Sequence, residues 1–193
     1  MKSRIQIIGV GGYGAYIANK MGPFSGSNCI GVDSDYSNLN RLKNLKQKVL
    51  LGGGKGALGT LASYDYGLAV TVHFCKKLEE IVQGKRNIIV SGFGGTGWGV
   101  TRFLMRSEAL KKSVFVLQMP FYFEGMKRMF KAEDNIRLAE YMKVRTVVLN
   151  EDKVMKYYRG RKGMDKINLF KRARQEMIEK VLEVYAHENK CIR

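Results

Sequence analysis

The sequence predicts an α/β fold in which a doubly wound, mostly parallel six-stranded sheet is followed by a long helix. Three observations lead to this prediction. Strand-like and helix-like segments alternate along the chain. Some of the strand-like segments, such as 114–117, are apolar at every position, which is typical of a parallel sheet covered on both faces. Two of them run directly into glycine-rich loops that open helices.

The elements follow from short apolar runs, which predict strands, and from longer segments with helical apolar spacing. Strands are expected at residues 4–10, 29–33, 48–51, 87–91, 113–119 and 145–149. Helices are expected at 13–21, 64–83, 97–110, 126–142 and 168–187, with a shorter one at 150–158. If the strands take the common order 3-2-1-4-5-6, the first and fourth are neighbours, and ligands bind at their carboxyl ends. Both glycine loops follow these two strands.

The composition predicts one domain spanning residues 1–193. The chain has 45% apolar residues and only 2 prolines, which favours a compact globule. No apolar run approaches the roughly 18–20 residues that cross a bilayer. The three cysteines lack metal-ligand spacing, and their odd number fits reduced thiols in the cytoplasm. The two histidines lie far apart in the sequence, which makes a zinc or Ser–His site a poor interpretation.

The net charge of +17 predicts affinity for polyanions such as nucleotides, nucleic acid, anionic lipid or an acidic protein. Basic residues are densest in the segment 156–174. A solvated basic surface explains this charge equally well. The candidate contacts for nucleic acid or an anionic membrane are Lys156, Arg159, Arg161, Lys162, Lys171 and Arg172.

One interpretation of the first glycine loop is a dinucleotide fingerprint. Gly9, Gly11 and Gly14 have the required spacing, and Asp33 ends the second strand 19 residues beyond Gly14, where such domains keep a ribose-binding acid. An NAD(P)-linked oxidoreductase is therefore an alternative. It leaves the second glycine loop, residues 92–99, without a role.

The order of motifs along the chain resembles the nucleotide-binding domain of the FtsZ/tubulin superfamily, and FtsZ more than tubulin. The first loop and helix, GVGGYGAYIANKM at 9–21, look like the FtsZ opening, and Val32-Asp33-Ser34-Asp35 stands where FtsZ has an Asn-Thr-Asp turn. FGGTGWG at 93–99 resembles the signature GGGTGTG. PFYFEGMKR at 120–128 matches Pro-Phe-x-x-Glu-Gly-x-x-Arg at each fixed position, and LNED at 149–152 replaces Pro-Asn-Asp. The similarity spans residues 4 to about 186.

The resemblance implies that GTP or GDP binds between the two loops, with magnesium as a candidate companion ion. Backbone N–H groups of both loops would hold the phosphates, and Thr96 would add a hydroxyl. Glu124 would accept from the ribose hydroxyls, with Arg128 beside the ribose and base, although these two residues could also be an ordinary i,i+4 pair. Trp98 is either a site residue or an anchor on the helix face. The expected nucleotide-binding residues are Gly11, Gly12, Tyr13, Gly14, Ala15, Tyr16, Asp33, Gly94, Gly95, Thr96, Gly97, Trp98, Glu124, Arg128, Asn150, Phe170, Arg174 and Gln175.

Several departures from the family pattern concern the base. Tyr16 replaces an Asn that reads the base in FtsZ. Phe170 stands where the family stacks an aromatic ring on guanine, but the Asp/Asn positions that follow become Arg174 and Gln175. A carboxylate accepts from N1–H and from the 2-amino group of guanine, whereas arginine donates to O6 and N7. Gln175 would restore part of the lost recognition.

Two further departures concern the γ-phosphate and hydrolysis. In the third glycine-rich loop, residues 52–62, the Ala-Gly-Gly of FtsZ is replaced by Thr60-Leu61-Ala62, and Lys55 is either a compensating charge or a solvated side chain. FtsZ and tubulin continue beyond the central helix into an acidic loop and a second domain, which this sequence does not include. We therefore expect negligible GTP turnover by these residues alone, with Asp65 as the substitute acid in trans if turnover occurs.

The sequence thus predicts a single-domain, cytoplasmic, FtsZ-like nucleotide-binding protein that acts in filament assembly or its regulation. Its partners would be a full-length FtsZ-like protein or further copies of itself. The alternative is a basic module that assembles on DNA or membrane.

Overall fold

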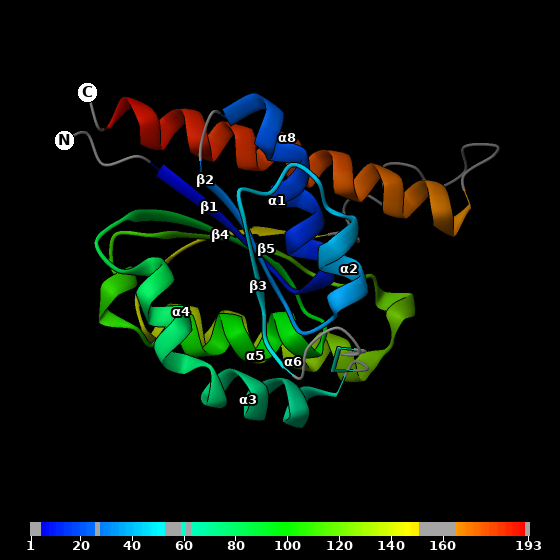
Figure 1. Ribbon diagram of the computed structural model, residues 1–193. Helices are drawn as coiled ribbons and strands as arrows, with labels where there is room; N and C mark the ends of the chain where they lie inside the picture. Colours follow the sequence, from blue (N-terminus) through cyan, green and yellow to red (C-terminus); the bar gives the residue numbers. More distant parts are fainter. Residues whose placement is uncertain (1–4, 26–27, 53–58, 61–62, 151–164, 192–193) are drawn as a thin grey trace.

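The computed structural model describes residues 5–25, 28–52, 59–60, 63–150 and 165–191. Their core is a six-stranded sheet with all strands parallel, in the order β3-β2-β1-β4-β5-β6 (Figure 1). The strands are β1 Ile5–Val10, β2 Asn28–Asp33, β3 Gln47–Leu50, β4 Arg86–Gly92, β5 Val114–Gln118 and β6 Arg145–Leu149. The predicted fold class and strand order are both confirmed.

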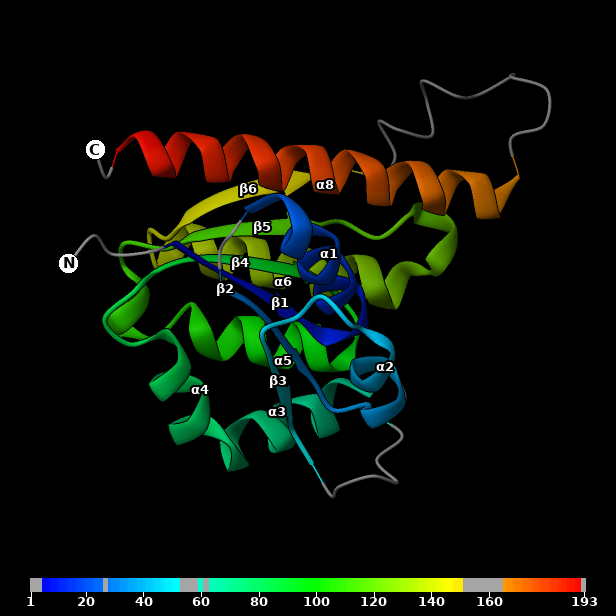
Figure 2. The same cartoon turned by 45° about the horizontal axis from the view of Figure 1, so that its top comes forward.

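Helices cover both faces of the sheet (Figure 2). One face is covered by α1 Gly11–Ser25 and α8 Lys166–Lys190, whose Ile17, Met21, Met177 and Val181 pack on β1, β4 and β5. The other face is covered by α3 Tyr64–His73, α4 Cys75–Val82, α5 Gly95–Leu104 and α6 Met126–Tyr141. This arrangement explains why β1, β4 and β5 bury nearly every side chain.

Three shorter elements connect the strands: α2 Tyr36–Arg41 and the 3-10 turns η1 Glu108–Leu110 and η2 Tyr122–Glu124. The helix α2 was not expected, because six mostly polar residues carry no helical apolar pattern. Asp35 begins it, since its carboxylate accepts a hydrogen bond from the backbone N–H of Asn38 at 3.0 Å. This cap also fixes the loop that follows β2.

The helix expected at 64–83 is two helices, and this prediction was wrong at Phe74. The backbone of Phe74, with φ −104° and ψ 17°, ends α3 and precedes α4. The break turns α4 so that Leu78, Ile81 and Val82 bury in the same core that Val70 enters from α3. The helix expected at 97–110 ends at Leu104, and η1 follows. Of the helix expected at 150–158, residues 151–158 lie outside the described residues.

Near its C-terminus, the long helix α8 contacts the amino-terminal ends of the strands, at the end of the sheet opposite the glycine loops. Glu188, 1% exposed, pairs with Arg145 at 2.6 Å and with Arg86 at 3.5 Å. Burial alone would raise the pKa of Glu188, but the hydrogen bond and charge of Arg145 outweigh it and lower that pKa below its ordinary value. Arg86 and Arg145 are the first residues of β4 and β6, so these two ion pairs hold the C-terminal part of α8 on the sheet.

Candidate functional site

The two glycine loops meet at the carboxyl edge of the sheet. Val10, the last residue of β1, is in register with Ser91 of β4, so both loops leave the sheet at the same level. Gly11 has φ +69°, and a Cβ there would lie 3.0 Å from the backbone nitrogen of Gly97. The N-termini of α1 and α5 therefore face one crevice, with their unpaired N–H groups and the positive ends of their dipoles.

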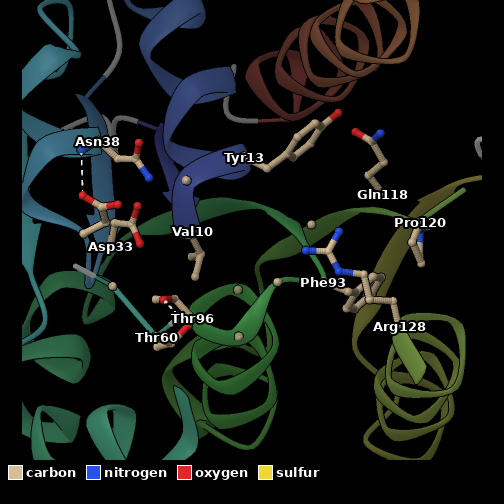
Figure 3. Close-up of a pocket in the computed structure, with 18 of the residues that line it drawn as sticks. Val10, Tyr13, Asp33, Asn38, Thr60, Phe93, Thr96, Gln118, Pro120 and Arg128 are labelled. Atoms are coloured by element: carbon tan, nitrogen blue, oxygen red, sulfur yellow. Dashed lines mark hydrogen bonds between the residues drawn. The ribbon is translucent and has the colours of Figure 1, made fainter. Parts of the chain in front are cut away.

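The crevice has a volume of about 410 Å³ (Figure 3). It is lined by the two loops, the ends of β2 and β5, the turn at residues 59–60, and the beginnings of α6 and α8. The lining residues are Val10, Gly11, Gly12, Tyr13, Asp33, Asp35, Asn38, Gly59, Thr60, Gly92, Phe93, Gly94, Gly95, Thr96, Gly97, Gln118, Met119, Pro120, Glu124, Arg128, Phe170 and Arg174.

The glycines of the loops have different physical roles. A Cβ at Gly14 would lie 2.1 Å from the carbonyl oxygen of Val90, and one at Gly97 would lie 2.3 Å from that of Gly92, so both allow a helix to approach β4 closely. A Cβ at Gly95 would meet Thr60 Oγ1 at 2.3 Å and the Ser63 carbonyl oxygen at 2.5 Å. A Cβ at Gly94, the N-cap of α5, would meet no atom within 4 Å. Gly94 is thus the glycine that leaves open space in the crevice.

A buried carboxylate lies beside the first loop. Asp33 is 3% exposed; its Oδ1 accepts from the N–H of Ser34 at 2.8 Å, whereas its Oδ2 makes no hydrogen bond of normal geometry, although the side-chain amide of Asn38 is close enough to favour the charged form. A Cβ on Gly12 would lie 3.5 Å from this Oδ2. Burial raises the pKa of Asp33 to about 6 from its ordinary 3.8, against the lowering effect of the Ser34 N–H. This Oδ2 can accept a proton, a ligand donor or a cation.

A chain of hydroxyl groups joins three segments below the loops. Ser34 Oγ and Thr96 Oγ1 lie 2.6 Å apart, and Thr96 Oγ1 donates to Thr60 Oγ1 at 3.4 Å. The chain links the loop after β2, the first turn of α5 and the turn at 59–60. Figure 3 shows Thr60 and Thr96 side by side at the base of the crevice. The hydroxyl of Thr96 therefore already has protein partners.

Glu124 and Arg128 form an ion pair at the beginning of α6. Glu124 Oε1 also accepts from the N–H of Phe121 at 2.9 Å, which holds the carboxylate in place. The i,i+4 pairing expected as one alternative is thus present, and both residues also line the crevice.

Aromatic side chains and a cation form the end of the crevice near α8. Phe170 packs edge-on against Phe121, with ring centroids 5.1 Å apart. Arg174, one turn further along α8, lies over the ring of Tyr16 at 5.0 Å. Phe170 and Arg174 both line the crevice. Tyr16 is not among the lining residues, but its ring contacts the guanidinium of Arg174.

The structure does not bring all expected site residues to the crevice. Trp98 is 5% exposed and packs edge-on against Tyr64 in the core, 5.5 Å between centroids, so it is an anchor of α5. Gln175 is exposed and donates to Glu179 at 2.9 Å. Gly14, Ala15 and Asn150 are also absent from the lining. Asp65 is exposed on the first turn of α3.

Some lining residues were missed by sequence reasoning, among them Asn38 and Gln118. Gln118 is the last residue of β5, and a polar residue at that end of a parallel strand is the signal that identifies it. Asn38 lies on the helix that was not expected.

The predicted basic partner surface lies mostly outside the described residues. Lys156, Arg159, Arg161 and Lys162 lie outside the described residues, as does Lys55. Lys171 and Arg172 are exposed on α8, and Arg172 pairs with Glu176 at 3.2 Å. Among the helices that the structure describes, none has the length and apolar character needed to cross a membrane.

Comparison with proteins of known sequence finds relatives among the cell division proteins. The FtsZ of Azotobacter vinelandii is 34% identical over 159 residues, covering 76% of this chain and 39% of that protein. FtsZ 1 of Pyrococcus abyssi is 29% identical over 164 residues, covering 80% and 43%. The chain thus spans well under half the length of these relatives. No protein-family model matches the chain.

Solved structures share the fold. An FtsZ dimer from M. jannaschii superposes with a TM-score of 0.82 at 24% identity, covering 96% of this chain and 55% of that one. GDP-bound CetZ1 from Haloferax volcanii gives 0.72 at 19% identity, covering 91% and 58%. A TubZ protofilament from bacteriophage PhiKZ gives 0.68 at 12% identity, covering 95% and 56%.

Proposed function

Because this chain belongs to the FtsZ/tubulin superfamily, we propose that it binds a guanine nucleoside di- or triphosphate in the crevice between its two glycine loops. The observation that carries the proposal is the meeting of two helix N-termini, those of α1 and α5, at the ends of the neighbouring strands β1 and β4. Two such ends supply N–H donors and partial positive charge for a chain of phosphates.

The remaining parts of the nucleotide have places in the crevice. Glu124, held by Phe121 and Arg128, presents a carboxylate that can accept from ribose hydroxyls. Phe170 supplies an aromatic wall for the base. These assignments leave the space beside Gly94 to the phosphates.

The arrangement beside Asp33 fits a magnesium ion carried by the nucleotide. Asp33 Oδ2 is a buried carboxylate oxygen that makes no hydrogen bond of normal geometry, and magnesium prefers oxygen ligands and is commonly held by one or two carboxylates plus phosphates. Bound magnesium would neutralise phosphate charge. Among the described residues, no group of three His, Cys, Asp or Glu side chains could hold a metal without the nucleotide.

We further propose a role in filament assembly or its regulation. This rests on the FtsZ relatives and on neighbours that include an FtsZ dimer and a TubZ protofilament. The partner would be a second copy of the chain or a longer FtsZ-like protein.

Hydrolysis by these 193 residues alone should be slow, because it requires an acid that orients the attacking water. Of the carboxylates that line the described crevice, Asp35 caps α2 and Glu124 holds Arg128. Asp33 is the residue that we assign to the magnesium ion. We also propose that residues 1–193 form one nucleotide-binding domain.

The experiment is a competition among nucleotides. Purified protein is incubated with magnesium and equal concentrations of GTP, GDP and NAD, passed through a desalting column and denatured, and the released nucleotides are separated by chromatography. We expect GTP or GDP at close to one equivalent. Retention of NAD alone would refute the proposal and favour the oxidoreductase alternative.

A further inference from the structure

One end of the crevice presents a buried amide without a full set of partners. Gln118 lies at the carboxyl end of β5, lines the crevice and is 6% exposed. Its Oε1 has no hydrogen-bond partner. Figure 3 shows Gln118 and Tyr13, which also lines the crevice, on the side of the crevice toward α8. A buried acceptor without a partner is costly, so a ligand donor at this position would be well placed to bind.

The same end of the crevice is positively charged. Arg174 of α8 lines it and stacks on Tyr16, whose ring also has Lys20 Nζ at 5.6 Å. A guanidinium donates hydrogen bonds and accepts none. It therefore favours a base that offers acceptors, such as the O6 and N7 atoms of a 6-oxopurine.

Of the three carboxylates that line the described crevice, two lie elsewhere, and the third, Glu124, is already held by Arg128 and by the N–H of Phe121. Asp33 and Asp35 follow β2 beside the first loop and the turn at Gly59. The crevice lining thus includes, besides these carboxylates, a donor on α8, Arg174, and an amide at the end of β5, Gln118. One amide oxygen can accept from N1–H of the base, but it cannot at the same time serve the 2-amino group as the second oxygen of a carboxylate would.

We propose that Gln118 and Arg174 select the base by its N1–H and C6 carbonyl, so that the crevice accepts hypoxanthine nucleotides as readily as guanine nucleotides. The inference rests on the proposed function, since it concerns the base of the same nucleotide. It adds that the 2-amino group, which distinguishes guanine from hypoxanthine, contributes little to binding here.

The test compares the affinities of GTP, ITP and ATP by calorimetry in the presence of magnesium. We expect the GTP and ITP affinities to agree within about threefold and ATP to bind about tenfold more weakly, since its 6-amino group is a donor that faces Arg174. A site that pairs the 2-amino group would instead favour GTP over ITP by about 10-fold or more, the usual effect of one unpaired polar group.

Two substitutions of Gln118 test different parts of the inference, the first its contact with the base and the second its indifference to the 2-amino group. Gln118→Leu should lower the affinities for GTP and ITP together, by about tenfold. Gln118→Glu adds a second acceptor oxygen, so it should raise the GTP-to-ITP affinity ratio to about 10. The matched controls are Gln175→Leu and Gln175→Glu, which alter an exposed glutamine outside the crevice and should leave the ratio unchanged.

A wild-type preference for GTP over ITP of tenfold or more would overturn the inference while leaving the proposed function intact. Equal effects of the Gln118 and Gln175 substitutions would also overturn it. If none of the three triphosphates binds, the proposed function fails, and the inference fails with it. Thermal unfolding of each variant separates loss of binding from loss of folding.

Discussion

Replacing Gly94 by aspartate should abolish nucleotide binding without weakening the fold. Gly94 is the N-cap of α5 with φ −76° and ψ 174°, a conformation open to any residue, and a Cβ there meets no atom within 4 Å. Aspartate is a preferred N-cap because its carboxylate accepts from N–H groups of the first turn. The melting temperature should therefore be unchanged or slightly raised.

The effect on affinity follows from charge and from competition for N–H groups. A carboxylate on residue 94 occupies the donors that the phosphates need and adds a negative charge near them. At about 4 Å and an effective dielectric constant of about 20, two unit charges repel by about 4 kcal/mol, so a loss of at least about 100-fold is expected. Gly94→Asn is the matched control, because it has the same shape and capping ability without the charge. It should lose about tenfold.

The assay is calorimetric titration of GDP with magnesium into wild type, Gly94→Asp and Gly94→Asn, together with thermal unfolding of each protein. Similar affinities for the two variants would show that no phosphate lies near Gly94. That result would refute the reasoning for both loops, since they meet at Gly11 and Gly97.

Three further predictions concern stability. Gly95→Ala should lower the melting temperature with or without nucleotide, because the new methyl group meets Thr60 Oγ1 at 2.3 Å and the Ser63 carbonyl at 2.5 Å; an unchanged melting temperature would contradict this. In metal-free buffer the pKa of Asp33 in the folded protein is about 6, above its ordinary 3.8. Ionising Asp33 therefore costs more in the folded than in the unfolded chain, and the free energy of unfolding should fall by roughly 2–3 kcal/mol as the pH rises from about 4 to about 6. In urea unfolding, Asp33→Asn should not show this fall in the free energy of unfolding between about pH 4 and about pH 6. If the free energies of wild type and variant changed in parallel with pH, the raised pKa of Asp33 would be contradicted. Glu188→Ala should lower the free energy of unfolding at pH 7 by about 2 kcal/mol, less than for a fully buried pair because Arg86 and Arg145 reach solvent. Since the pKa of Glu188 is lowered, this difference should shrink as the pH falls below 4.5, and a constant difference would argue against the ion pair.

The sheet could be predicted from the sequence because its signals are local. Runs such as 5–10 and 114–118 are too short and too apolar for anything but buried strands, and glycine loops after the first and fourth strands indicated where the winding reverses. The break at Phe74 could not be predicted, because apolar positions continue across it at helical spacing and only packing on the sheet decides the angle between α3 and α4.

The site was predicted well where a motif fixes the backbone and less well where side-chain direction matters. Successive residues of a helix point about 100° apart, so Arg174 can line the crevice while Gln175 faces solvent. For the same reason Trp98, although next to the glycine loop, points into the core. Gln118 carries no motif; its place at the end of β5 is a weaker signal, and only the structure shows that its buried oxygen has no partner.

Nucleotide binding between the two glycine loops is tested most directly by a crystal structure of the chain grown with GDP and magnesium. We expect the phosphates against the backbone N–H groups of Gly12 and of Gly94 to Gly97, the ribose beside Glu124 and the base near Phe170. Density for GDP outside this crevice, or with its phosphates beside Phe170 and its base at the glycine loops, would contradict this placement.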